Sequence, residues 1–141
     1  MYLDTAILVK LYVRESDSDH FARLADGQSI VSSTLALTEF WSALLGKERG
    51  REIDAALRHR AWTAFEADIE AETIRLEPIR LPILKKANRI LANCHPRVPL
   101  RSLDSIHLAT CDHLQDWPLC TTDRRMLDAA VLLGFPVAAG A

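Results

Sequence analysis

Short apolar runs of extended character alternate along this chain with longer segments whose apolar residues have helical spacing. Tyr2–Leu3 has the character of the end of a buried strand, and Asp4 places a charge where that strand would stop. Thr5–Tyr12 then forms an apolar, helix-compatible segment. Further strands are predicted at residues 29–31, 73–77 and 119–122 and at Val137, and further helices at residues 16–25, 34–46, 51–70, 82–95, 103–114 and 124–133.

Strands that alternate with helices predict the α/β class, here a three-layer α/β/α sandwich around a mostly parallel sheet. At 141 residues the chain is long enough to bury a proper core, and we expect one domain over residues 1–141. Ligands of open α/β sheets bind beyond the carboxyl ends of the strands. Because Asp4 directly follows the first strand, it lies where chemistry is expected.

Residues 33–70 predict a helical hairpin with a break bracketed by Gly46 and Gly50. A helical wheel places Glu39 on the polar side of the first helix, opposite its core face. The predicted core positions of this helix are Leu37, Phe40, Trp41 and Leu44, and those of the second helix are Ile53, Leu57, Ala61, Phe65 and Ile69.

Composition narrows the classes of function. The net charge of -2 gives no global positive field, which counts against a tight non-specific nucleic-acid binder. It does not count against an enzyme that meets phosphate through bound metal ions.

No apolar run approaches the roughly 18 residues of a membrane span. The N-terminus lacks the basic start of a signal peptide, so the expected location is the cytoplasm. The three cysteines of the chain, Cys94, Cys111 and Cys120, are expected to be reduced and buried.

Three further carboxylates stand at positions like that of Asp4. Asp123 follows a predicted strand and opens a helix, where a helix N-cap is the better explanation of this residue taken alone. Asp104 lies on a largely apolar helix, which is costly for a charge unless a cation or several donors satisfy it. Near a helix start it could also be a cap, or be neutralised by Arg101. Glu39, on a polar helix face, is either a solvent-exposed residue or a cleft carboxylate.

The joint pattern favours one site. Asp4 and Asp123 each end a strand, while Asp104 and Glu39 lie about one turn into helices that begin near strand ends. Four carboxylates at one sheet edge repel one another, so they would titrate upward or demand divalent cations. Hard oxygen ligands without paired Cys or His residues point to Mg²⁺ or Mn²⁺. Such a cluster is suited to positioning a water in phosphodiester cleavage.

Four sequence blocks carry a resemblance to a known family. They are M-Y-L-D-T-A-I-L-V-K-L-Y, S-S-T-L-A-L-T-E-F, L-R-S-L-D-S-I-H-L-A-T and C-T-T-D-R-R-M-L-D-A-A. In this order and with this spacing, the blocks resemble the signature of the PIN-domain ribonucleases, and among these the VapC toxins of bacterial toxin–antitoxin pairs. Any one block is a weak motif, whereas the four in sequence span nearly all of the chain.

The resemblance implies that Asp4, Glu39, Asp104 and Asp123 form an acidic quartet around a metal site, with Mg²⁺ as the cofactor and Mn²⁺ as a substitute. It implies a five-stranded parallel sheet and a metal-dependent endoribonuclease that acts on single-stranded RNA. It also implies a homodimer silenced by a small antitoxin, whose tail often brings an arginine to the acids. The hairpin of residues 33–70 matches the part of the fold that grips this partner.

One departure from the family pattern keeps alternatives open. The small hydroxyl residue usual two positions after the first Asp is Ala6 here, so metal affinity or rate could be reduced unless Thr5 substitutes. A catalytically weakened binding or regulatory module is therefore the alternative function. Ala6 also argues against an aspartyl-phosphate phosphatase, which needs an acid there. The histidines are scattered, with His107 interpreted as packing, and Asp128 is either an outer acid of the site or part of a solvated helix face.

Overall fold

A parallel sheet forms the centre of the computed structural model, which describes residues 1–138. The strands are hydrogen-bonded in the order β3-β2-β1-β4, and all neighbouring pairs are parallel. The elements in chain order are β1 (Tyr2–Leu3), α1 (Thr5–Tyr12), α2 (Ser18–Ala25), β2 (Ile30–Ser33), α3 (Leu35–Arg49), α4 (Ala55–Glu70), β3 (Ile74–Glu77), α5 (Leu81–Cys94), α6 (Ser102–Leu114), β4 (Leu119–Cys120) and α7 (Arg124–Leu133).

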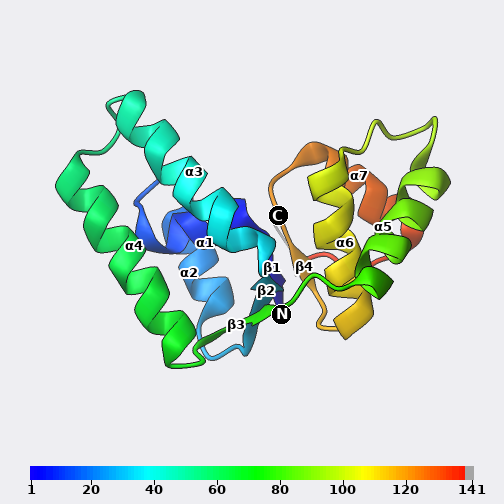
Figure 1. Cartoon of the computed structure of the whole chain (residues 1–141), viewed down its shortest axis with the longest axis horizontal. Coiled ribbons are helices and arrows are strands. Elements are labelled where there is room, and N and C mark those ends of the chain that lie inside the picture. The colour runs from blue at the N-terminus through cyan, green and yellow to red at the C-terminus, as the bar shows by residue number, and fades with distance from the viewer. Residues whose placement is uncertain (139–141) are drawn as a thin grey trace.

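Helices cover both faces of the sheet, as Figure 1 shows, with α1–α4 on one side and α5–α7 on the other. Side chains of successive strand residues point to opposite faces. Leu3 accordingly packs with Ile7, Leu8, Phe40 and Phe65 of α1, α3 and α4. Its neighbour Tyr2 belongs to the core that contains Val31, Ile83, Leu108, Leu119 and Met126. The α/β fold with a parallel sheet between helices, predicted from the sequence, is therefore confirmed.

The prediction of a fifth strand at Val137 is wrong, because the sheet of residues 1–138 has four strands. A single parallel bridge joins Leu119 to Val137. The amide of Leu119 donates to the Pro136 carbonyl at 2.9 Å, and the amide of Ala138 donates to the Leu119 carbonyl at 2.9 Å. Pro136 has no amide hydrogen of its own to extend the ladder. Residues 139–141, which end the predicted domain, lie outside the described part.

The helical hairpin differs from the prediction in its break and in its core face. Helix α3 continues through Gly46 to Arg49, and α4 begins only at Ala55, where the Asp54 side chain accepts from the amide of Leu57 at 2.7 Å. A side-chain cap of this kind fixes a helix start. Of the predicted core positions, Phe40 and Leu44 are fully buried, whereas Leu37 is 38% exposed and Ala36 takes its place.

Several other sequence predictions are confirmed. Helix α7 has the predicted bounds and ends at Gly134, whose φ of 71° is the left-handed conformation that favours glycine. Strand β3 lies at the sheet edge. The cysteines Cys94, Cys111 and Cys120 are free and buried. No helix within residues 1–138 has the length and apolar character needed to span a bilayer.

Candidate active site

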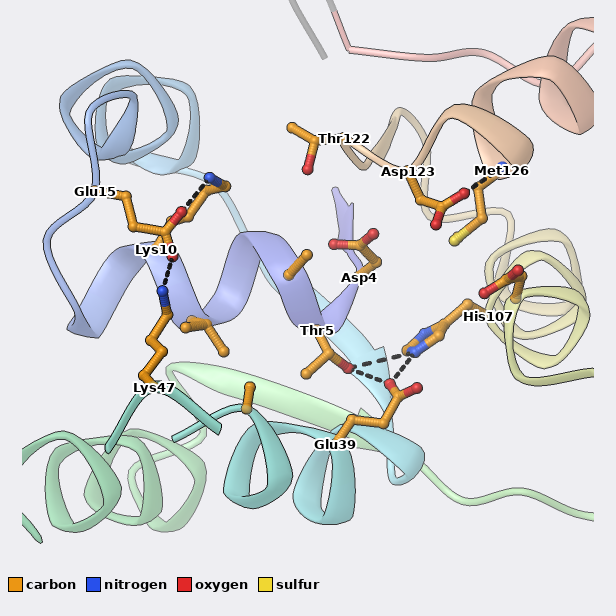
Figure 2. A pocket seen from close by; sticks show the side chains of 14 residues that line it. Asp4, Thr5, Lys10, Glu15, Glu39, Lys47, His107, Thr122, Asp123 and Met126 are labelled. Carbon is orange, nitrogen blue, oxygen red and sulfur yellow. Dashed lines mark hydrogen bonds and ion pairs between the residues drawn. The ribbon is translucent and has the colours of Figure 1, made fainter. Parts of the chain in front are cut away.

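The four predicted carboxylates meet at one pocket of about 400 Å³ beyond the carboxyl ends of β1 and β4. Asp4 follows β1, and Asp123 follows β4. Glu39 comes from α3, and Asp104 comes from α6. The remaining lining residues are Thr5, Ala6, Val9, Lys10, Glu15, Ala43, Lys47, His107, Thr122 and Met126. In Figure 2 these side chains surround the open space from α1, α3, α6 and α7. The sequence-based expectation that the four acids share one edge of the sheet agrees with this placement.

Asp4 is a buried carboxylate with hydrogen bonds but no counter-ion. Its Oδ1 accepts from the amide of Ile7 at 2.9 Å, so it caps α1, and its Oδ2 accepts from the hydroxyl of Thr121. Burial raises the pKa of the Asp4 carboxyl above its usual value, although both hydrogen bonds oppose this shift. Among residues 1–138, no basic side chain forms an ion pair with Asp4. Within the described residues, its charged form is therefore stabilised by hydrogen bonds alone and not by an ion pair.

The Thr121 hydroxyl joins two of the acids. It donates to Asp4 and accepts from the amide of Asp123 at 3.0 Å, and its side chain is fully buried. This hydroxyl therefore fixes the end of β4 relative to the end of β1.

Replacing Thr121 with Val should lower the free energy of unfolding by about 1–3 kcal/mol, because an acceptor of Asp4 and the Asp123 amide both lose a buried partner. Thr121→Ser keeps the hydroxyl and serves as the matched control. Urea unfolding followed by circular dichroism measures both variants. Equal stability of the Val variant and the parent protein would contradict this role of the hydroxyl.

Asp104 and Asp123 lie against two arginines. Arg101 donates from Nε to Asp104 at 3.2 Å and from a terminal nitrogen to Asp123 at 3.4 Å. Arg125 lies within ion-pair distance of the same two carboxylates, at 3.8 and 3.5 Å. Asp123 also caps α7, accepting from the amides of Arg125 at 2.8 Å and Met126 at 3.2 Å. The cap and the Arg101 pairing, two explanations that the sequence left open, are both confirmed and coexist with a place in the pocket.

Glu39 is held by hydrogen bonds from two other elements, shown by the dashed lines in Figure 2. Its Oε2 lies 2.5 Å from the Thr5 hydroxyl, which donates to it, and 2.7 Å from Nε2 of His107. Burial alone would raise the pKa of this carboxyl. The hydrogen bonds from His107 and Thr5 outweigh burial, so the pKa of Glu39 lies below its usual value. Of the two interpretations that the sequence left open, Glu39 is thus the cleft carboxylate.

A chain of ion pairs closes the opposite end of the pocket. Glu15 bridges Lys10 at 2.6 Å and Lys47 at 2.8 Å, and these lysine side chains are only 12% and 18% exposed. Burial alone would raise the pKa of Glu15, but hydrogen bonds with Lys10 and Lys47 outweigh it and lower that pKa. The chain links α1, the segment after α1, and α3.

Replacing Glu15 with Gln should reduce the free energy of unfolding at neutral pH by roughly 1–2 kcal/mol, between the values for exposed and buried pairs. The folded-state pKa lies below the unfolded one. The stabilisation is therefore present above about pH 4.3, the ordinary Glu value, and is lost as the pH falls through the folded pKa. Urea unfolding at pH 7 and in acid measures the difference between the two proteins. A difference that is unchanged in acid would contradict the ion-pair origin.

The donor set of the pocket suits a hard divalent cation. Five carboxylates line it and no cysteine of the described residues does, and Asp4 has hydrogen bonds but no ion pair within residues 1–138. Within residues 1–138, however, no three acidic, histidine or cysteine side chains converge tightly enough to hold a metal as they stand. The carboxylates of Asp104 and Asp123 lie on Arg101 and Arg125 instead. The residues fit Mg²⁺ or Mn²⁺ provided that these two acids exchange an arginine for the cation.

Two residues of the site were missed or misjudged from the sequence. His107 was interpreted as packing within its helix, yet it touches Glu39 and lines the pocket. Thr121 gave no signal beyond being a hydroxyl residue two positions before Asp123. Asp128 pairs with Arg124 at 3.0 Å on the exposed face of α7 and is not among the lining residues. Ala6 lines the pocket, and the Thr5 hydroxyl that could replace the missing one is directed to Glu39.

Comparison with known proteins gives two matches. The sequence profile of the PIN domain matches residues 1–132. Ribonuclease VapC46 of Mycobacterium tuberculosis strain H37Rv is 38% identical over 146 aligned positions, which cover 99% of this chain and 96% of that protein. Both matches extend over all four acidic positions of the pocket.

Proposed function

Because the chain belongs to the PIN-domain family, among the VapC-type ribonucleases, we propose that it is a Mg²⁺-dependent endoribonuclease and the toxin of a toxin–antitoxin pair. The observation that carries the proposal is the meeting of Asp4, Glu39, Asp104 and Asp123 at one pocket, from four separate segments of the chain. The first residue of the set is buried and forms no ion pair within residues 1–138, which favours occupancy of the pocket by a cation.

In the proposed reaction, Asp4 with Asp104 and Asp123 would hold one or two Mg²⁺ ions, directly or through water, and Glu39 would complete the shell or position the attacking water. When bound, Mg²⁺ would supply Lewis-acid chemistry there: a lower pKa of water and compensation of charge on the phosphate. The water oxygen attacks phosphorus in line, and the bond to the leaving 3′ oxygen breaks. No side chain of the chain serves as the nucleophile. Arg101 and Arg125, once they leave Asp104 and Asp123, are placed to meet phosphate oxygens.

The antitoxin partner follows from the resemblance and from the charge of the pocket. An arginine from a partner would compensate Asp4, which no basic side chain of residues 1–138 does. The use of the α3–α4 hairpin as the partner clamp and the homodimer both stay predictions. We also propose that the protein acts in the cytoplasm, where its three free cysteines would remain reduced.

RNA cleavage by the purified protein, free of antitoxin, tests the proposal. We expect end-labelled single-stranded RNA to be cut in Mg²⁺ or Mn²⁺, to stay intact in EDTA, and to be cut again when Mg²⁺ is restored. RNA binding without cleavage under any metal would favour the weakened binding module, for which Ala6 is the sequence argument. Equal cleavage in EDTA would favour a metal-free mechanism.

A further inference from the structure

His107 is a buried histidine, 3% exposed, with a partner on each ring nitrogen. The Tyr2 hydroxyl lies 2.8 Å from Nδ1, and the Glu39 carboxylate lies 2.7 Å from Nε2. The three residues come from β1, α6 and α3 and lie far apart in sequence. Figure 2 shows the ring of His107 directed at Glu39 and Thr5 from the opposite wall of the pocket.

The direction of these hydrogen bonds follows from Tyr2. Its side chain is fully buried, and burial raises the pKa of its hydroxyl well above the ordinary value, so the hydroxyl keeps its proton. A buried hydroxyl needs an acceptor for that proton. Within the described residues, the hydrogen-bond partner of this hydroxyl is Nδ1 of His107, and the Glu39 carboxylate, whose pKa lies below its usual value, can only accept from Nε2. Nδ1 of His107 is therefore the acceptor for Tyr2, and the ring proton resides on Nε2, facing Glu39.

Glu39 is consequently held by one oxygen only. Its Oε2 accepts from Nε2 of His107 and from the Thr5 hydroxyl, whereas Oε1 has no hydrogen-bond partner in the described chain. Two donors on one oxygen fix the plane of the carboxylate and leave the other oxygen for a ligand in the pocket. A carboxylate held in this way is pre-oriented, in the same way that the ligands of metal sites are commonly oriented by their outer hydrogen-bond partners.

We propose that Tyr2 and His107 form a buried relay that positions Glu39: Tyr2 fixes the His107 tautomer, and His107 holds the Glu39 carboxylate with one oxygen free for the cation or its water. The relay rests on the proposed function, because it assigns Glu39 to the metal site. Both residues are positioning residues. With both ring nitrogens engaged, His107 has no free nitrogen with which to take a proton from water, so it is not the base of a metal-free mechanism.

The first test reads the tautomer directly. Long-range proton–nitrogen NMR of ¹⁵N-histidine-labelled, metal-free protein distinguishes a proton on Nε2 from one on Nδ1. The signal that disappears in His107→Gln assigns His107 among the five histidines. We expect the Nε2–H form in the parent protein and, in Tyr2→Phe, a shifted Nδ1 signal, because Nδ1 loses the hydroxyl that donates to it. An Nδ1–H form, or a doubly protonated ring at neutral pH, would overturn the relay.

The second test measures Mn²⁺ affinity by calorimetry, with thermal unfolding as a check that each variant is folded. We expect His107→Leu to bind Mn²⁺ about 10–100-fold more weakly and Tyr2→Phe several-fold more weakly. His107→Gln retains an N–H donor for Glu39 and should recover most of the affinity. Tyr12→Phe removes a hydroxyl that donates to Asp68 outside the pocket and should change nothing. Full affinity of a folded His107→Leu protein would overturn the proposal. A parent protein that neither binds Mn²⁺ nor cuts RNA would instead refute the proposed function, leaving the NMR result to decide on the relay.

Discussion

Asp4→Asn should cut RNA roughly 1,000-fold more slowly than the parent protein and yet unfold at a higher temperature in EDTA. The activity loss follows from removal of one carboxylate from a site that stabilises transition-state charge by several kcal/mol. The gain in stability follows from the raised pKa of Asp4, whose folded-state value exceeds the unfolded one. Such a group stabilises the fold fully below the unfolded pKa of about 3.9, and this contribution is lost as the pH rises through the folded value.

Above the unfolded pKa, the Asp4 carboxyl therefore stabilises the fold less than it does in acid, and Asn removes this penalty while it keeps an oxygen for the amide of Ile7. Thermal unfolding with and without Mg²⁺ measures both effects. Binding to the folded state should raise the melting temperature of the parent protein but leave that of Asp4→Asn unchanged. A melting temperature of Asp4→Asn below that of the parent protein in EDTA would contradict this account of the buried charge.

Phe40→Ala should produce the largest loss of stability, about 3–5 kcal/mol, because it empties a fully buried aromatic position. The Phe40 ring stacks on Phe65 with centroids 4.1 Å apart and meets Tyr12 edge-on at 5.6 Å, so one truncation removes contacts with both α4 and α1. Since Glu39 precedes Phe40 on α3, its carboxylate should also lose its fixed position.

Leu37→Ala is the matched control for Phe40→Ala, because it truncates an apolar side chain on the same helix that is 38% exposed. Urea unfolding should show a loss below about 1 kcal/mol for this variant. Similar losses for both variants would contradict the core face of α3 that the structure shows.

Local sequence signals were sufficient to predict the acidic residues at the strand ends. Asp4 and Asp123 could be placed because a buried strand followed by an acidic cap has a short-range pattern, and parallel strands bring their carboxyl ends to one edge. Glu39 and Asp104 needed the joint pattern, since each alone has an ordinary explanation. The core face of α3 was predicted one position out because the helix wheel cannot tell Leu37 from Ala36 when both are apolar.

Contacts between distant elements could not be predicted. The bond between His107 and Glu39 depends on where α3 and α6 lie across the pocket, 68 residues apart in sequence. The ion pairs that Arg101 and Arg125 form with Asp104 and Asp123 likewise depend on side-chain positions on two helices. The prediction of a strand at Val137 failed because a single bridge joins Val137 to Leu119, and Pro136 has no amide hydrogen with which to begin the ladder earlier.

The central claim is that the acids of the pocket carry out metal-dependent cleavage of RNA. The most direct measurement compares the single-turnover cleavage rate of Asp123→Asn with that of Asp128→Asn, in Mg²⁺. Both residues lie at or in α7, but only Asp123 lines the pocket, and Asn keeps its capping role. We predict that Asp123→Asn loses at least about 100-fold in rate. Asp128→Asn should cut like the parent protein, and equal rates for the two variants would contradict the claim.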